Sequence, residues 1–194
     1  MTCGLILAAG ESRRMGSPKA LLEFQGETFL DRLIGLFARR CSPVIVVLGA
    51  QRETVRAGLR RAGEALLMDN PDFRLGQFTS MQSGLRAVPA DAEGVLFTLV
   101  DHPAVTPATV DALLDCSAPA PLRIPRYDGR RGHPIWISKF LMPEFLALPA
   151  GSSAREVVTR RTGGTAYIDV DDPGILADVD DPAAYARLLA GSGA

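Results

Sequence analysis

Short apolar runs alternate with segments of helical periodicity along this chain. The apolar runs, bounded by polar or turn-forming residues, predict strands at residues 3–9, 44–48, 64–68, 94–100 and 135–137. Between them, apolar residues recur at helical spacing and predict helices at residues 28–40, 52–61, 79–88, 106–116 and 154–162. The run 44–48 is apolar throughout, as expected for a strand buried on both faces. This alternation predicts an α/β fold with a mostly parallel sheet that helices cover on both faces.

Polar residues mark where several of these helices begin. Thr106 precedes Pro107 and is expected to be an N-cap, because proline is tolerated at the first helical position. Ser153 and Glu156 have the spacing of a capping box. Asp181 is expected to cap a last helix that begins at the next residue. We expect that helix to bury Tyr185, Leu188 and Leu189.

Length and composition indicate one globular domain. The chain has 194 residues, of which 47% are apolar and 22% charged. We expect the domain to span residues 1–190, followed by a frayed tail at 191–194. The net charge is −1, so no basic field favours binding to nucleic acid or to an anionic membrane. No apolar stretch approaches the ~20 residues of a membrane helix and no signal peptide is recognisable, so we expect a cytoplasmic protein.

Three cysteines, Cys3, Cys41 and Cys116, are scattered along the chain. Their number is odd and none has C-x-x-C spacing, so they predict neither a disulfide framework nor a metal knuckle. We expect buried or half-buried structural thiols.

A loop rich in small and basic residues follows the first predicted strand. It contains Gly10 and Gly16, which can adopt positive φ where a turn requires it, together with Arg13, Arg14 and Lys19. Main-chain N–H groups and cations around such a turn form an anion site that suits the triphosphate of a nucleotide. The glycine spacing matches neither the P-loop, G-x-x-x-x-G-K-[ST], nor the dinucleotide fingerprint, G-x-G-x-x-G. The loop therefore predicts NTP binding outside the common ATPase and dehydrogenase classes.

Carboxylates gather at the same predicted edge of the sheet. Asp101 comes directly after the strand 94–100, where ligands bind in open α/β proteins. Mg²⁺ bound with a nucleotide takes one or two carboxylates, phosphate oxygens and water, so Asp101 is a candidate ligand of Mg²⁺. Asp178 and Asp180 alternate in the sequence and are expected to point to one face.

The loop resembles, along its whole length, the L-A-[AG]-G-x-S-x-R-M-G-x-x-K signature of nucleotidyltransferases, which include the molybdenum cofactor cytidylyl- and guanylyltransferases. Every fixed position is filled, by Leu7, Ala8, Ala9, Gly10, Ser12, Arg14, Met15, Gly16 and Lys19. Residues 99–103 resemble the family's L-x-D-x-P element. Residues 178–182 resemble its late D-[IV]-D-T-P-E-D element, which the chain leaves at Ala183. This resemblance, to the MobA-like NTP transferases, implies a three-layer α/β/α, Rossmann-like fold.

The resemblance also implies roles for individual residues. The expected catalytic residues are Arg14, Lys19 and Asp101. Asp101 is the expected Mg²⁺ ligand, with Asp180 as the second ligand and Asp178 as the alternative to it. Residues 76–85 resemble the family segment beside the nucleotide base. The expected nucleotide contacts are therefore Leu7, Ala8, Ala9, Gly10, Ser12, Arg13, Arg14, Gly16, Lys19, Ser80 and Gly84.

Two further elements concern the acceptor. Residues 129–134 resemble the G-x-x-G-H-P segment of the cytidylyltransferase branch, which implies an acceptor contact by His133; taken alone, His133 fits a structural turn equally well. Residues 151–155 resemble the element G-D-x-G-A-R, so Arg155 is a second expected acceptor contact, although Ser152 replaces the acidic residue. His102 occupies a variable family position and has no expected catalytic role.

Together these elements predict a Mg²⁺-dependent nucleotidyltransferase, in which an acceptor phosphate attacks the α-phosphorus of an NTP and pyrophosphate leaves. Ala9 and the G-H-P segment resemble the cytidylyltransferase branch, which favours CTP and molybdopterin as substrates and a molybdenum hydroxylase as a partner. Two alternatives stay open. One is a sibling enzyme that uses GTP, or a sugar or other phosphate as acceptor. The other is a non-catalytic accessory protein that binds a nucleotide or cofactor.

Overall fold

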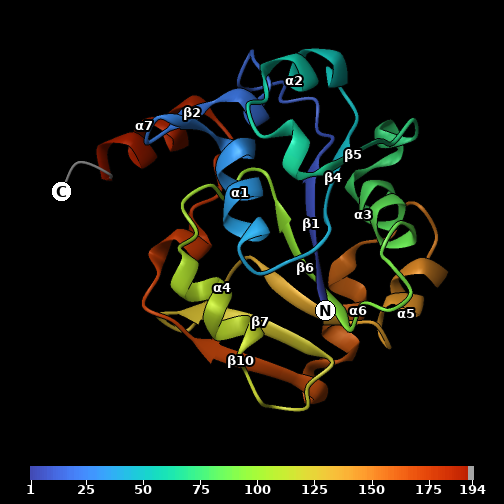
Figure 1. The fold of residues 1–194 in the computed structure, drawn as a ribbon. Coiled ribbons are helices and arrows are strands. Elements are labelled where there is room, and N and C mark those ends of the chain that lie inside the picture. Colours follow the sequence, from blue (N-terminus) through green and yellow to red (C-terminus); the bar gives the residue numbers. More distant parts are fainter. Residues whose placement is uncertain (192–194) are drawn as a thin grey trace.

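The computed structural model describes residues 1–191 and shows a central sheet between two layers of helices (Figure 1). Within these residues one eight-stranded sheet has the order β10-β7-β9-β6-β1-β4-β5, with β8 paired to β7. Most neighbouring strands run parallel. Strand β9 is antiparallel to β6 and β7, and β8 is antiparallel to β7. The strands are β1 (Thr2–Ala8), β4 (Val44–Leu48), β5 (Leu66–Asp69), β6 (Gly94–Leu99), β7 (Leu122–Tyr127), β8 (Arg130–Arg131), β9 (Ile135–Ser138) and β10 (Thr165–Asp169). A separate hairpin pairs β2 (Glu23–Phe24) with β3 (Glu27–Thr28).

Successive residues along the strands point alternately into two apolar cores, one on each face of the sheet. Along β1, Ile6 and Ala8 face one core and Leu5 and Leu7 face the other. The first core lies under α1 (Phe29–Ala38), α2 (Arg52–Gly58), α4 (Pro107–Leu114) and α7 (Pro182–Gly191). The second lies under α3 (Gln77–Arg86), α5 (Met142–Ala147) and α6 (Ala154–Arg160). The predicted three-layer α/β/α fold with a mostly parallel sheet is confirmed.

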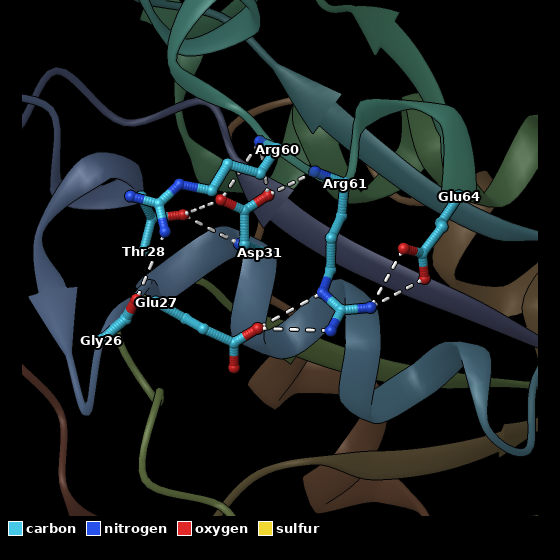
Figure 2. Close-up of polar contacts among 7 residues, drawn as sticks. All are labelled: Gly26, Glu27, Thr28, Asp31, Arg60, Arg61 and Glu64. Carbon is cyan, nitrogen blue, oxygen red and sulfur yellow. Dashed lines mark hydrogen bonds and ion pairs between the residues drawn. The ribbon is translucent and has the colours of Figure 1, made fainter.

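A buried carboxylate on α1 explains why α2 is shorter than predicted. Asp31 is 1% exposed and accepts hydrogen bonds from the main-chain N–H groups of Arg60 (3.0 Å) and Arg61 (2.8 Å), as Figure 2 shows. The chain is extended at Leu59 and thereby delivers these N–H groups to Asp31. The helix therefore ends at Gly58, and its predicted continuation to residue 61 is wrong.

All three predicted capping residues lie directly before their helices, and two of them accept a hydrogen bond from the first turn. Ser153 and Glu156 form the capping box of α6, and Asp181 accepts a hydrogen bond of 2.8 Å from the N–H of Ala184. Thr106 occupies the N-cap position of α4, but its hydroxyl donates to Asp172 (2.8 Å) and does not cap the helix.

The last helix differs from the prediction at its end. Leu189 is 45% exposed, so its predicted burial is wrong, whereas Tyr185 and Leu188 pack partly buried against the core. The helix also includes Gly191, where the frayed tail was expected to begin, and residues 192–194 lie outside the described part of the chain. Among the described residues, no helix combines the length and apolar character needed to cross a membrane.

Candidate functional site

Two clefts open at the carboxyl ends of β1 and β6, where the strand order changes direction. The chain passes from β1 to β4 on one side, and β6 lies on the other. Ligands of open α/β sheets bind at such switch points. The loop cleft, of about 490 Å³, lies between residues 10–20 and the side chains of Asp101 and Asp180. The arginine-rimmed pocket, of about 770 Å³, is lined by residues 130–133 and 150–155 among others.

The loop after β1 folds back on itself around Ser12. This residue has φ +51°, and its Oγ accepts a hydrogen bond from the main-chain N–H of Lys19 at 3.0 Å. Its carbonyl accepts another from the N–H of Met15 at 2.9 Å. Gly16 has φ +71°, a conformation that glycine adopts without strain. These contacts bring Lys19 to the floor of the loop cleft, at the start of the short helix η1 (Lys19–Leu21).

Most of the predicted nucleotide contacts line the loop cleft, namely Leu7, Ala8, Gly10, Ser12, Arg13, Arg14 and Lys19. Ala9 and Gly16 are not among its lining residues. Ala9 is 6% exposed and packs against Gly49, where an added Cβ would lie 2.9 Å from the Cβ of Ala9. Ala9 therefore supports the loop from behind, and Gly16 supplies its turn.

Lys19 joins two carboxylates across the loop cleft. Its Nζ lies 2.6 Å from Oδ1 of Asp180 and 3.5 Å from Oδ2 of Asp101. Arg14 approaches the second oxygen of Asp180 at 3.8 Å. The hydrogen bond from Lys19 lowers the pKa of Asp180, whereas burial raises the pKa of Asp101 against the opposing charge of Lys19. The structure thus brings the three residues predicted to be catalytic together with Asp180.

The segment before α7 presents its aspartates as the alternation predicts. Asp178 and Asp180 are exposed, whereas Val179 between them is 1% exposed. The main-chain N–H of Val179 donates to the carbonyl of Asp101 at 2.9 Å and ties this segment to the end of β6. Of the two aspartates, Asp180 is the one that contacts Lys19.

A buried carboxylate that the sequence analysis missed, Asp172, holds the start of this segment. It is 3% exposed and accepts hydrogen bonds from the N–H of Thr106 (2.9 Å), the hydroxyl of Thr109 (2.6 Å) and the N–H of Gly174 (2.9 Å). It thereby links the start of α4 to the short helix η5 (Pro173–Leu176). The available signal was its place before Pro173, where an aspartate favours a helix start.

The loop cleft fits a Mg²⁺–nucleotide complex. Oδ1 of Asp101 is buried and has no hydrogen-bond partner among the described residues. Within residues 1–191, no three His, Cys, Asp or Glu side chains converge on a metal site. Mg²⁺ in nucleotide sites takes only one or two carboxylates and completes its shell with phosphate oxygens and water. Asp101 and Asp180, drawn together by Lys19, provide that number of carboxylates.

The arginine-rimmed pocket combines a cationic rim with an apolar floor. Arg130, Arg131 and Arg155 line it together with His133, and no Asp or Glu occurs among its lining residues within the described chain. The apolar lining residues include Phe78, Met81, Phe97, Leu99, Ile124 and Ile135. Both residues predicted to contact the acceptor, His133 and Arg155, therefore lie in this pocket. Ser152 also lines this pocket. Because it stands where the family element has an acidic residue, the rim carries no negative charge at this position.

Two histidines pack against each other, of which His133 lines the arginine-rimmed pocket and His102 lines neither cleft. The rings of His102 and His133 are 4.7 Å apart between centroids, tilted by 38°. Nε2 of His102 lies 3.7 Å from Oδ1 of Asp101. Burial lowers the pKa of each histidine to about 4, so both rings are neutral at pH 7. His102, which has no expected role from the sequence, thus contacts both a predicted metal ligand and a predicted acceptor ligand.

The two predicted contacts on α3 lie behind the clefts. Ser80 is 1% exposed, and its Oγ accepts a hydrogen bond from Nδ2 of Asn70 at 2.9 Å. Gly84 packs against β1, where an added Cβ would lie 2.3 Å from Cδ1 of Leu5. Gln77 and Phe78, at the start of α3, line the pockets instead. Base contact by Ser80 and Gly84 stays a prediction, and Asn70 is the residue that orients Ser80.

Comparison with known proteins places these features in a family. Residues 4–165 match the family described as the MobA-like NTP transferase domain. The molybdenum cofactor cytidylyltransferase of Escherichia coli (strain K12) is 26% identical over 92% of this chain and 90% of its own length. The purine catabolism protein PucB of Bacillus subtilis (strain 168) is 30% identical over 94% and 93%, respectively. The probable molybdenum cofactor guanylyltransferase of Mycobacterium ulcerans (strain Agy99) is 31% identical over 93% and 89%.

A solved structure of a related chain contains manganese. Rv0371C from Mycobacterium tuberculosis H37Rv, determined in complex with manganese, is 26% identical and superimposes with a TM-score of 0.81. The superposition covers 97% of this chain and 98% of the other. The fold of this chain is therefore shared, over nearly its whole length, with that protein.

Proposed function

The chain belongs to the MobA-like NTP transferase domain family and is a nucleotidyltransferase, and we propose that it transfers CMP from CTP to molybdopterin with release of pyrophosphate. The observation that carries this proposal is the common wall of the two clefts, formed by Leu7, Gln77 and Leu99. An α-phosphorus bound in the loop cleft and an acceptor phosphate bound in the arginine-rimmed pocket can meet across this wall.

The reaction needs charge balance and positioning rather than a covalent enzyme nucleophile. An oxygen of the acceptor phosphate attacks the α-phosphorus, the bond from that phosphorus to the bridging oxygen breaks, and pyrophosphate leaves. The loop N–H groups and Arg14 hold the triphosphate, and Lys19 offsets the charge that develops on the transferred and leaving groups. Asp101 and Asp180 would hold Mg²⁺, which when bound neutralises charge on phosphate oxygens.

The lining of the arginine-rimmed pocket supports a phosphorylated acceptor with a ring system. Arginine guanidinium groups bind phosphate oxygens through paired hydrogen bonds, and three arginines line this rim. Phe78 and Phe97 of the floor can pack against a ring system. Molybdopterin combines a fused ring system with a terminal phosphate, which is the chemistry that this rim and floor would bind.

Two observations favour CTP as the nucleotide. The alanine at position 9 makes the loop resemble the cytidylyltransferase branch, and one relative is named a cytidylyltransferase. GTP is the second candidate, because a relative of 31% identity is named a guanylyltransferase. With CTP, the product would be a cytosine-dinucleotide cofactor, and a molybdenum hydroxylase would be its recipient.

The test is pyrophosphate release by the purified protein with Mg²⁺, molybdopterin and each NTP. We expect faster release with CTP than with GTP, and equal or reversed rates would contradict the nucleotide assignment. Release only with a sugar phosphate or another acceptor would indicate a sibling enzyme. NTP binding without pyrophosphate release under any acceptor would indicate a non-catalytic accessory protein.

A further inference from the structure

We propose that His102 is a positioning residue that holds the carboxylate of Asp101 and links it to His133 in the arginine-rimmed pocket. This inference rests on the proposed function in one respect, that Asp101 binds the divalent cation. His102 itself lines neither the loop cleft nor the arginine-rimmed pocket.

The two oxygens of Asp101 face different partners. Oδ2 faces Lys19 in the loop cleft at 3.5 Å. Oδ1 is buried, has no hydrogen-bond partner within the described residues, and faces Nε2 of His102 at 3.7 Å. That distance is too long for a hydrogen bond, but hydrogen bonds in catalytic sites often shorten when the ligands bind. A ligating carboxylate needs such a partner, because groups behind metal ligands fix their orientation.

The other side of His102 rests on His133. The two ring centroids are 4.7 Å apart, and an edge contact of 5.7 Å between centroids sets the ring of His133 against Phe97. The main-chain N–H of His133 donates to the carbonyl of Ile175 at 3.1 Å. His133 is thus fixed on two sides, and it braces His102 against Asp101.

A packing role alone does not account for His102. The residue is 7% exposed, yet its Nδ1 has no hydrogen-bond partner among the described residues, although a buried polar atom without a partner is costly. A phenylalanine would fill the same space without that cost. The nitrogen that faces Asp101 is Nε2, so the proposal requires a donor at that ring position.

Three variants separate these roles. His102→Gln keeps an N–H donor near the position of Nε2, His102→Asn moves it to the position of Nδ1, and His102→Phe removes it. The readout is the binding of Mn²⁺ alone, measured as free Mn²⁺ by electron paramagnetic resonance, with the melting temperature as the folding check. Thr98→Val, which removes a buried hydroxyl from β6, the strand that precedes His102, is the matched control.

We expect His102→Phe and His102→Asn to weaken Mn²⁺ binding about tenfold or more, and His102→Gln to stay within about threefold of wild type. Thr98→Val should bind as wild type does. Equal binding by all three variants, rescue by Asn as good as by Gln, or no Mn²⁺ binding by the wild type would overturn the proposal. The Gln and Asn comparison decides the matter if the Phe variant does not fold. Failure of the proposed function is read separately, from pyrophosphate release by the wild type.

Discussion

Nζ of Lys19 lies 2.6 Å from Oδ1 of Asp180, although 161 positions separate the two residues in the sequence. The side chain of Lys19 is 13% exposed, and that of Asp180 is 53% exposed. This ion pair joins the loop after β1, which contains Lys19, to the segment before α7, which contains Asp180. Asp101 also lies 3.5 Å from Nζ of Lys19, so one ammonium group faces two carboxylates at the place where a triphosphate and its cation would bind.

Replacement of this lysine tests its catalytic role. Lys19→Ala should lower kcat by about 10²–10³, the typical effect of losing one group that stabilises developing charge. The melting temperature should change little, because the main-chain N–H of Lys19 still reaches Ser12. Lys139→Ala, at the end of β9 and away from both clefts, is the control. Loss of folding by Lys19→Ala would show that the lysine is structural.

Stability should fall as the pH drops from about 6.5 to 4. The folded-state pKa values of His102 and His133 are each about 4, below the ordinary value of 6.5, so the unfolded chain takes up protons that the folded chain does not bind. The contribution of the two neutral histidines to the free energy of unfolding is fully present above pH 6.5 and is lost as the pH falls through 4. The raised pKa of Asp101 acts in the opposite sense, favouring the folded state at low pH.

Urea unfolding at pH 7.5 and pH 5 measures this dependence. His133→Phe should reduce the difference between the two free energies of unfolding relative to wild type. An undiminished difference in that variant would show that His133 is not buried in its neutral form.

Asp172→Ala should destabilise the fold. It leaves the N–H of Thr106, the hydroxyl of Thr109 and the N–H of Gly174 without their acceptor. We expect a loss of about 3 kcal/mol in the free energy of unfolding by urea, since buried unsatisfied donors are costly. Asp171→Ala, one residue earlier and exposed, should change it by less than about 0.5 kcal/mol. Equal losses in both variants would refute the anchoring role of Asp172.

Arg155→Ala should weaken the binding of the acceptor and leave the binding of the nucleotide unchanged. Loss of a charge-assisted hydrogen bond predicts a rise of about tenfold in KM for molybdopterin, with KM for CTP unchanged. Arg160→Ala, on the same helix but paired with Glu156 at 3.8 Å, should leave both values unchanged. A parallel rise of both KM values in Arg155→Ala would place this residue outside the acceptor site.

Local sequence was sufficient for the features that depend on neighbouring residues. The run Val44–Leu48 matches its strand in full, and the capping box of Ser153 needs only the residue three positions later. By contrast, β7 (Leu122–Tyr127) escaped prediction because Pro125 and two arginines interrupt its apolar pattern.

Long-range contacts account for what the sequence could not show in the site. Asp101 could be placed at the end of its strand, but the contact between the next residue, His102, and His133 joins two segments that are distant in the sequence. The anchoring role of Asp172 depends on Thr106, which lies at the start of α4 and 66 positions away in the sequence. The burial of Ser80 depends on Asn70, which donates to it from the neighbouring loop.

The most direct test of nucleotidyl transfer follows the α-phosphorus itself. Purified protein is incubated with Mg²⁺, molybdopterin and CTP labelled at the α-phosphorus, and the products are separated by chromatography. We predict that the label moves into a molybdopterin–cytosine dinucleotide while unlabelled pyrophosphate is released in equal amount. Label that stays in CTP, or that appears only as free CMP, would contradict the account.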